Sequence, residues 1–227
     1  MSKKRKVKKR RIKYKNIFKF IVFLLLILVI VYFILNRKIK NIYIEGNSEL
    51  TDQEIIDIAG LKNYPKMVSI NPKKISSNLD SNIYIASSKI KLNHIKRQIT
   101  IKISENKPIL YYEYDGVYLL SDGSQVKDKK YNLPFLINQT PDEYLKKLLL
   151  ALNKLDDGVL DRISEIRYYP SKVDQELFYL TMTDGNYVYI NFNSFDKLNN
   201  YSDFVKSFDN KKGILHLDSG DYLEILN

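Results

Sequence analysis

An apolar run near the N-terminus constrains this chain more than any other feature of its sequence. The run Phe20–Leu35 contains sixteen residues and no charged side chain. Extended back to Ile17, it would form about 28 Å of helix, which is enough to cross the hydrocarbon core of a bilayer. A cleaved signal peptide has an apolar segment of only about 7–15 residues. The sequence therefore predicts an uncleaved transmembrane helix over residues 20–36.

The net charge of +11 comes entirely from the first 19 residues. They hold eleven Lys and Arg and no acid, whereas the other 208 residues hold 26 basic and 26 acidic side chains. This excess predicts that the tail, residues 1–19, lies in the cytoplasm against anionic membrane lipid. Residues 37–227 are then expected outside the cell, as in a single-pass type II protein of the cell membrane. Because the external part carries no net charge, we expect no nucleic acid among its partners.

The stretch IEGNSELTDQEI, residues 44–55, predicts a strand that turns directly into a capped helix. Gly46 can adopt the positive φ that ends such a strand. Thr51 and Glu54 have the spacing of a capping box, and Leu50 and Ile55 have that of a hydrophobic staple. We expect this helix to cover a sheet rather than to take part in chemistry.

The rest of segment 37–107 predicts a second helix and two further strands. The pair Asn71-Pro72 suits the N-cap and first position of a helix, whose buried face is expected to include Ile83. Residues 89–93 and 98–103 alternate between apolar and polar side chains, as half-buried strands do. Since the chain has no cysteine, packing must stabilise this strand-helix-helix-strand-strand unit.

Residues 108–227 form a second block, for which we predict a mixed α/β domain with an antiparallel sheet. Asp-Gly pairs, the first at 115–116, predict tight hairpin turns between apolar strands. One helix is expected from an N-cap at Thr140, and another over about 195–208. A candidate edge strand closes the chain and consists of Tyr222, Leu223, Glu224, Ile225 and Leu226.

Eighteen tyrosines and no tryptophan give the chain an unusual aromatic content. Four of them, Tyr111, Tyr112, Tyr114 and Tyr118, cluster on one predicted hairpin. Tyrosine suits both strand packing and protein interfaces, so both interpretations stay open.

No pattern in the sequence predicts a catalytic or metal-binding site. His94 and His216 lie far apart, and neither has a second ligand at metal spacing. The Ser-x-x-Lys spacing of Ser/Lys hydrolases occurs at Ser88/Lys91, Ser104/Lys107, Ser124/Lys127 and Ser194/Lys197. Neither companion motif, Ser-Asp-Asn or Lys-Thr-Gly, is present. We therefore expect no enzyme activity and no cofactor, with a membrane-anchored Ser/Lys-type hydrolase as the alternative.

The order of these parts resembles the FtsQ/DivIB family of cell-division proteins. After the anchor, IKNIYIEGNSELTDQEIIDIAGL is similar to the start of a POTRA domain. Glu105 and Pro108 match the Glu-x-x-Pro through which the family passes from POTRA into its β-domain, and Asp122 and Gly123 match the hairpin that follows. The resemblance divides the chain into a basic tail (1–19), an anchor (20–36), a POTRA domain (37–107) and an FtsQ/DivIB-type β-domain (108–227).

This resemblance implies a non-catalytic divisome scaffold at the division septum, which supports septum formation and septal peptidoglycan synthesis. It implies single-pass partners of the FtsL and DivIC/FtsB type, with a septal peptidoglycan synthase as a further candidate. Strand addition at a sheet edge would bind such partners through backbone hydrogen bonds, and residues 222–226 are the candidate edge. A POTRA-like interaction module of another envelope process is the remaining alternative.

Overall fold

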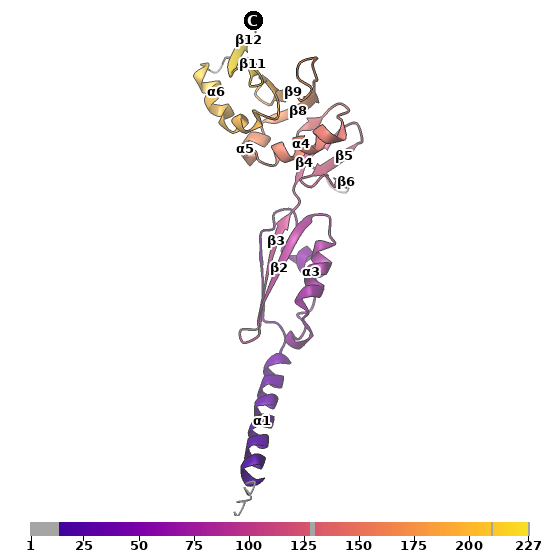
Figure 1. Cartoon of the computed structure of the whole chain (residues 1–227), viewed down its shortest axis with the longest axis vertical. Coiled ribbons are helices and arrows are strands. Elements are labelled where there is room, and N and C mark those ends of the chain that lie inside the picture. Colours follow the sequence, from indigo (N-terminus) through magenta and orange to yellow (C-terminus); the bar gives the residue numbers. More distant parts are fainter. Residues whose placement is uncertain (1–13, 128–129, 210, 227) are drawn as a thin grey trace, which may run out of the picture. The chain divides into compact units, whose positions relative to one another are not determined.

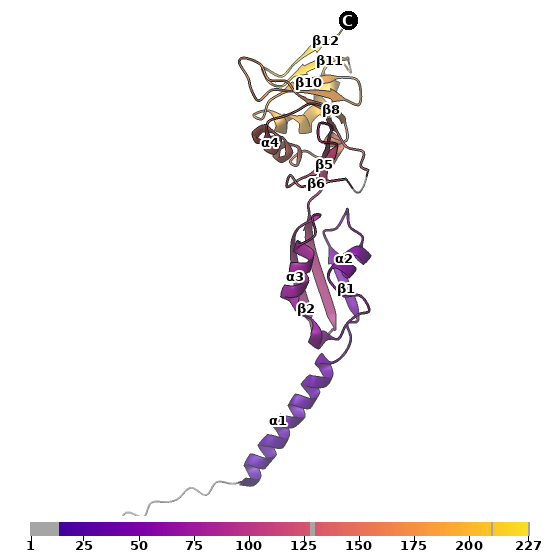
Figure 2. The same cartoon turned by 90° about the vertical axis from the view of Figure 1, so that its right-hand side faces the viewer.

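The computed structural model describes residues 14–127, 130–209 and 211–226. The chain divides into two compact units, one made of residues up to 81 with 87–103, and the other of 82–86 with 104 onward. Both combine helices with a sheet, so the predicted α+β fold is confirmed. Figures 1 and 2 show the elements of each unit from two sides.

The apolar run forms one long helix, α1 (Tyr14–Leu35). Among the described residues the helix already includes 14–19, ahead of Phe20, because Lys15 and Lys19 are good helix formers and can reach out of an apolar layer with their charged ends. The stretch Tyr14–Ile34 is long and apolar enough to cross a membrane, and none of it is buried inside the protein. Most of the basic tail predicted for residues 1–19 lies outside the described residues.

A three-stranded sheet and two short α-helices follow the anchor. The elements are β1 (Asn41–Glu45), α2 (Asp52–Ile58), the 3-10 turn η1 (Met67–Ser69), α3 (Pro72–Asp80), β2 (Ile85–Asn93) and β3 (Gln98–Glu105). The strand order is β1-β3-β2, and β1 pairs with β3 in parallel. In Figure 2, α2 and α3 lie beside each other against this sheet. The predicted order of strand, helix, helix, strand, strand is therefore confirmed.

The start of α2 has the predicted capping box. The Thr51 hydroxyl accepts a hydrogen bond from the N–H of Glu54 at 3.3 Å, and the Glu54 carboxylate accepts one from the N–H of Thr51 at 2.8 Å. Leu50 and Ile55 are both buried, as the two ends of a hydrophobic staple should be. These bonds satisfy N–H groups that the first turn of a helix leaves without a partner.

Helix α3 also starts as predicted, with Asn71 as its N-cap and Pro72 in its first turn. The side-chain oxygen of Asn71 accepts hydrogen bonds from the N–H groups of Lys73 and Lys74. The prediction that Ile83 shares the buried face of this helix is wrong. The helix ends at Asp80, so the spacing of four no longer sets the direction of Ile83, and its side chain is exposed.

The second unit is built on a nine-stranded sheet, seen at the top of Figure 1. Its strands are β4 (Pro108–Tyr112), β5 (Val117–Leu120), β6 (Gln125–Val126), β7 (Phe135–Leu136), β8 (Ile163–Tyr168), β9 (Phe178–Met182), β10 (Tyr187–Ile190), β11 (Gly213–His216) and β12 (Tyr222–Ile225). They lie in the order β12-β11-β10-β9-β8-β7-β4-β5-β6. Antiparallel pairs predominate, but β4 with β7, β7 with β8, and β10 with β11 are parallel.

Helices cover one face of this sheet and close the core. They are α4 (Asp142–Leu152), α5 (Asp157–Leu160), η2 (Phe195–Asn200) and α6 (Tyr201–Ser207). Leu148 and Leu152 of α4 share one apolar cluster with Phe178 and Val188 from the middle strands. Because side chains alternate along a strand, the neighbouring tyrosines of β9 and β10 lie on the opposite face.

Two predicted helix features of this unit are corrected. Thr140 does not cap α4, because Pro141 occupies the N-cap position and the Thr140 hydroxyl donates instead to the carbonyl of Asn138 at 3.3 Å. The helix expected over 195–208 is divided into a 3-10 segment and a shorter α-helix. Asn199 and Asn200 lie at this division, and asparagine is a weak helix former.

Candidate partner-binding edge

Strand β12 forms one edge of the nine-stranded sheet and pairs on its inner side with β11. The side chains of Tyr222, Glu224 and Ile225 are exposed, whereas Leu223 packs against the core. Leu226 lies just beyond the strand and is also exposed. The structure thus places the five predicted residues at a sheet edge.

The backbone of β12 alternates between groups that face β11 and groups that face outward. The N–H of Leu226 donates to the carbonyl of Lys212 at 3.2 Å, so the backbone of Leu226 faces the segment that leads into β11. Alternation then turns the backbone of Glu224 toward β11 as well, and that of Leu223 and Ile225 outward. The outward N–H and C=O groups are those that an added strand would bind.

A buried polar cluster holds β11 in place behind this edge. The N–H of Gly213 donates to the side-chain oxygen of Asn186 at 3.0 Å, and the amide nitrogen of Asn186 donates to the Tyr201 hydroxyl at 3.1 Å. The same hydroxyl donates to the Asp184 carboxylate at 2.9 Å. Burial raises the pKa of Tyr201, so this phenol stays neutral at ordinary pH. The cluster therefore links the β9–β10 turn, α6 and β11.

A row of aromatic rings crosses the sheet face that the helices leave open, and it ends at β12. The ring of His216 stacks on Tyr222 with 4.5 Å between centroids, and Tyr189 lies 5.2 Å away on β10. Three further rings continue the row at centroid distances of 4.8–6.3 Å: Tyr179, Tyr187 and Tyr169. We call these six residues the aromatic row. Burial raises the pKa of Tyr179 and Tyr189, so both hydroxyls are neutral.

Two carboxylates flank the imidazole of His216. Its Nε2 lies 3.2 Å from Glu224 on β12, and its Nδ1 lies 3.6 Å from Asp218 in the turn that follows β11. Together with the stacking on Tyr222, these contacts connect the side chains of β12 to β11 on the open face. The edge strand is therefore held by side chains as well as by its backbone.

Comparisons with known proteins agree with this architecture. The family model for the FtsQ-type POTRA domain matches residues 37–106. Cell division protein DivIB of Bacillus subtilis (strain 168) is 29% identical over 211 residues, covering 89% of this chain and 80% of the relative. DivIB of Listeria monocytogenes is 28% identical over 213 residues, covering 89% and 78% respectively. Residues 37–106 thus match an FtsQ-type POTRA domain, and the chain is similar to DivIB cell-division proteins over most of its length.

A solved structure is also similar to this chain. It is the major extracytoplasmic domain of DivIB from Geobacillus stearothermophilus, with 25% sequence identity and a TM-score of 0.40. The match covers 47% of this chain and 97% of that chain. With its similarity to cell-division proteins and an apolar N-terminal helix long enough to cross a membrane, the chain fits a single-pass membrane protein.

Two of the four Ser/Lys pairs are not arranged as a hydrolase would need. Ser88 and Lys91 are three residues apart on β2 and therefore lie on opposite faces of the strand. The hydroxyl of Ser194 bonds to Asn191, and Lys197 forms an ion pair with Asp221 at 2.7 Å. Serine activation requires a basic group within hydrogen-bonding distance, and these lysines are not placed to supply it.

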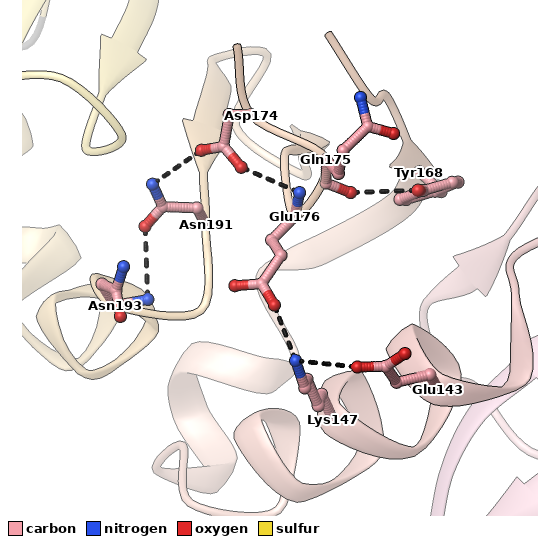
Figure 3. A network of polar contacts seen from close by, with 8 residues as sticks. All are labelled: Glu143, Lys147, Tyr168, Asp174, Gln175, Glu176, Asn191 and Asn193. Carbon is pink, nitrogen blue, oxygen red and sulfur yellow. Dashed lines mark hydrogen bonds and ion pairs between the residues drawn. The ribbon is translucent and has the colours of Figure 1, made fainter. Parts of the chain in front are cut away.

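Lys147 forms two ion pairs, which Figure 3 shows. Its Nζ lies 2.6 Å from Glu176 and 3.4 Å from Glu143, above the ring of Tyr144. The hydrogen bond with Glu176 raises the pKa of Lys147 above its usual value. A raised pKa keeps the ammonium protonated, which suits a structural ion pair and not a general base.

Metal binding has no support in the part of the chain that the structure describes. No three His, Cys, Asp or Glu side chains gather there in a way that could hold an ion. His94 lies exposed in the turn between β2 and β3, and His216 belongs to the aromatic row in the other unit.

Sequence reasoning placed the candidate edge but did not find the aromatic row beside it. The hairpin tyrosines that it noticed lie elsewhere, with Tyr112 buried and Tyr111 packed 4.9 Å from Tyr118. The sequence does contain a pattern that points to the aromatic row, because Tyr187 and Tyr189 alternate with residues that are buried. The row becomes visible once β9, β10, β11 and β12 are known to be neighbours.

Proposed function

We propose that this chain is a non-catalytic scaffold of the division machinery that binds other single-pass division proteins by strand addition at β12. The partners are proteins of the FtsL and DivIC/FtsB type, and the assembly supports septum formation and septal peptidoglycan synthesis. One observation carries the proposal: β12 is an edge strand whose Leu223 and Ile225 direct their backbone groups away from β11.

The side chains around β12 suit an added strand on both faces of the sheet. On the open face, a partner strand would extend the aromatic row beyond Tyr222, and tyrosine is enriched in the cores of protein interfaces. On the other face, exposed Ile225 offers an apolar contact next to Leu223. The backbone would supply affinity, and these side chains would select the partner.

The proposal includes the rest of the organisation predicted from sequence. Residues 37–107 act as the POTRA domain and residues 108–227 as the β-domain. The basic tail stays in the cytoplasm against anionic lipid, and the protein gathers at the septum. A fluorescent fusion to the N-terminus tests the location. Rings at mid-cell support the proposal, whereas uniform membrane labelling contradicts it.

The edge is tested by replacing Ile225 with proline, because proline has no N–H to offer an added strand. The N–H of Ile225 points outward, so Ile225→Pro leaves the bonds between β11 and β12 intact. An edge position of this kind tolerates proline. We expect the variant to lose co-purification with a DivIC-type protein.

The matched control is Ile225→Ala, which removes the same side chain but keeps the N–H. It should retain more binding than Ile225→Pro if the backbone bond carries the affinity. Glu224→Pro is a poorer test, because its N–H faces β11 and its loss would disturb the hairpin. Amide hydrogen exchange in β10 and β11 reports whether the domain remains folded. Undiminished binding by a folded Ile225→Pro variant would overturn strand addition at β12.

A further inference from the structure

The POTRA domain begins almost directly at the end of the membrane anchor. Helix α1 ends at Leu35, and the carbonyl of Arg37 already accepts a hydrogen bond from the N–H of Met67 at 2.9 Å. Two residues span at most about 7 Å of extended chain. Arg37 and the residues that it contacts are therefore held next to the lipid headgroups, whatever direction the anchor takes.

Three chain segments meet at this end of the POTRA domain. The carbonyl of Pro65 accepts a hydrogen bond from the N–H of Ile39 at 3.0 Å, and the carbonyl of Arg97 accepts one from the N–H of Lys40 at 2.8 Å. Lys38 also forms a β-bridge with Lys66. We call this part of the domain, made of segments 36–40, 59–74 and 93–97, the junction end.

The junction end carries a strong positive charge. Its segments contain nine Lys and Arg and no Asp or Glu, although the POTRA domain as a whole has seven acidic residues. Among the described residues, Lys62 is the one of these nine that forms an ion pair, with Asp57 at 3.7 Å. The Lys38–Lys66 bridge even places two cations side by side. An arrangement of like charges gains free energy when anions bind to it.

Apolar side chains project from the same end. Ile95, in the turn between β2 and β3, is 89% exposed, and Val68 is 60% exposed. The side chain of Asn93 accepts a hydrogen bond from the N–H of Lys96 at 3.0 Å, which fixes that turn. Apolar side chains among Lys and Arg are typical of surfaces that enter the headgroup layer of a membrane.

From these observations we infer that the junction end is a binding surface for anionic phospholipid headgroups of the outer leaflet. The cations of Lys38, Lys66 and Lys96 pair with lipid phosphates, while Ile95 and Val68 enter the layer between them. A soluble anionic polymer would satisfy the charges but leave the exposed isoleucine and valine in water. The two-residue junction also brings lipid, and not a polymer, within reach at all times.

The absence of tryptophan allows a direct test in the full chain. Ile95→Trp introduces a single tryptophan at the junction end. Val173→Trp is the matched control, because Val173 is 97% exposed and belongs to the other unit. Both variants are placed in nanodiscs of phosphatidylglycerol and phosphatidylcholine that contain brominated lipid. We expect a blue shift and a loss of fluorescence for Ile95→Trp, and neither for Val173→Trp.

The role of charge is tested in the same Ile95→Trp background. Lys66→Glu together with Lys96→Glu should restore the fluorescence, as should nanodiscs of phosphatidylcholine alone. Lys146→Glu together with Lys154→Glu makes the same change of charge in the β-domain and should leave the quenching in place. Hydrogen exchange in β3 shows whether each variant keeps a folded POTRA domain.

Three results would overturn the inference. The first is a folded Ile95→Trp variant that is not quenched in the anionic nanodiscs. The second is equal quenching in nanodiscs of phosphatidylcholine alone, which would mean apolar contact without headgroup recognition. The third is binding of soluble polyphosphate while the tryptophan stays unquenched, which would identify an anionic polymer as the occupant. Each of these results leaves strand addition at β12 untouched.

Discussion

Gly213 on β11 lies directly opposite Ile225 on the edge strand β12. A Cβ atom at Gly213 would overlap the carbonyl oxygen of Glu224, so the two strands can approach each other because this position has no side chain. The free edge of the sheet thus depends on a glycine in the neighbouring strand.

Gly213→Ala should displace β12 from β11. Overpacking of this kind typically costs about 1–3 kcal/mol, and here the contact is with backbone that cannot turn aside. We expect a lower free energy of unfolding in urea and faster amide exchange at Leu223. Gly158→Ala is the control, since a Cβ at that position meets nothing within 4 Å. An equal loss of unfolding free energy in Gly213→Ala and Gly158→Ala would show that the close approach of β11 and β12 does not affect stability.

Alkaline pH should destabilise the β-domain through Tyr201. Burial raises the pKa of this phenol in the folded state, and its hydrogen bond to Asp184 adds to the effect. The contribution of this raised pKa to the free energy of unfolding is complete below about pH 10, the pKa of an unperturbed tyrosine. Above that value the unfolded chain releases a proton that the folded chain keeps, so stability falls as pH rises.

Tyr201→Phe should make the alkaline decline in stability less steep. Tyr168, Tyr179 and Tyr189 also have a raised pKa, so part of the decline should remain. The measurement is the free energy of unfolding in urea as a function of pH, from about pH 9 upward. A slope that is identical in the two proteins would contradict the role given to Tyr201.

Thr51→Ala should weaken the start of α2 in the POTRA domain. Loss of an N-cap side chain costs about 1 kcal/mol, and this one belongs to a complete capping box. Amide exchange within α2 should accelerate, while exchange in the β-domain stays unchanged. Thr51→Ser keeps the hydroxyl and should behave almost as the unaltered chain does. Exchange rates that do not distinguish alanine from serine would rule out the cap as a source of stability.

Simultaneous replacement of Ser88, Ser104, Ser124 and Ser194 by alanine should leave cell division unaffected. The structure gives three of these hydroxyls polar neighbours other than a lysine: Ser76, Asp122 and Asn191. Complementation of a strain that lacks the chain is the measurement, with circular dichroism to confirm folding. Loss of division together with loss of a measurable hydrolase activity would restore the enzyme interpretation.

Local features of the fold could be predicted from the sequence because neighbouring residues determine them. Thr51 and Glu54 form a capping box at a fixed spacing, and both partners come from one turn of helix. The Asp-Gly hairpins are local in the same sense, as at Gly185, where φ is +86°. The error at Ile83 arose because the helix ends early at Asp80, and the error at Thr140 arose because Pro141 takes the N-cap position.

The arrangement of the sheet could not be predicted in the same way. The parallel pairs of β7 join segments that are far apart along the chain, and core packing decides their register. The candidate edge at β12 was predicted from the alternation of residues 222–226 and from the resemblance to the FtsQ/DivIB family. The pairing of β12 with β11 decides which N–H groups of β12 point outward. The same pairing brings His216 onto Tyr222, and neither fact could be read from the sequence.

The two-residue step from Leu35 to Arg37 also limits how a partner can encounter the POTRA domain. A domain on so short a connection stays at a nearly constant height above the bilayer. Partners that are themselves anchored search for it in two dimensions within a thin layer, which raises the local concentration of both. Contacts too weak to persist between free proteins in solution can then hold an assembly together in the membrane.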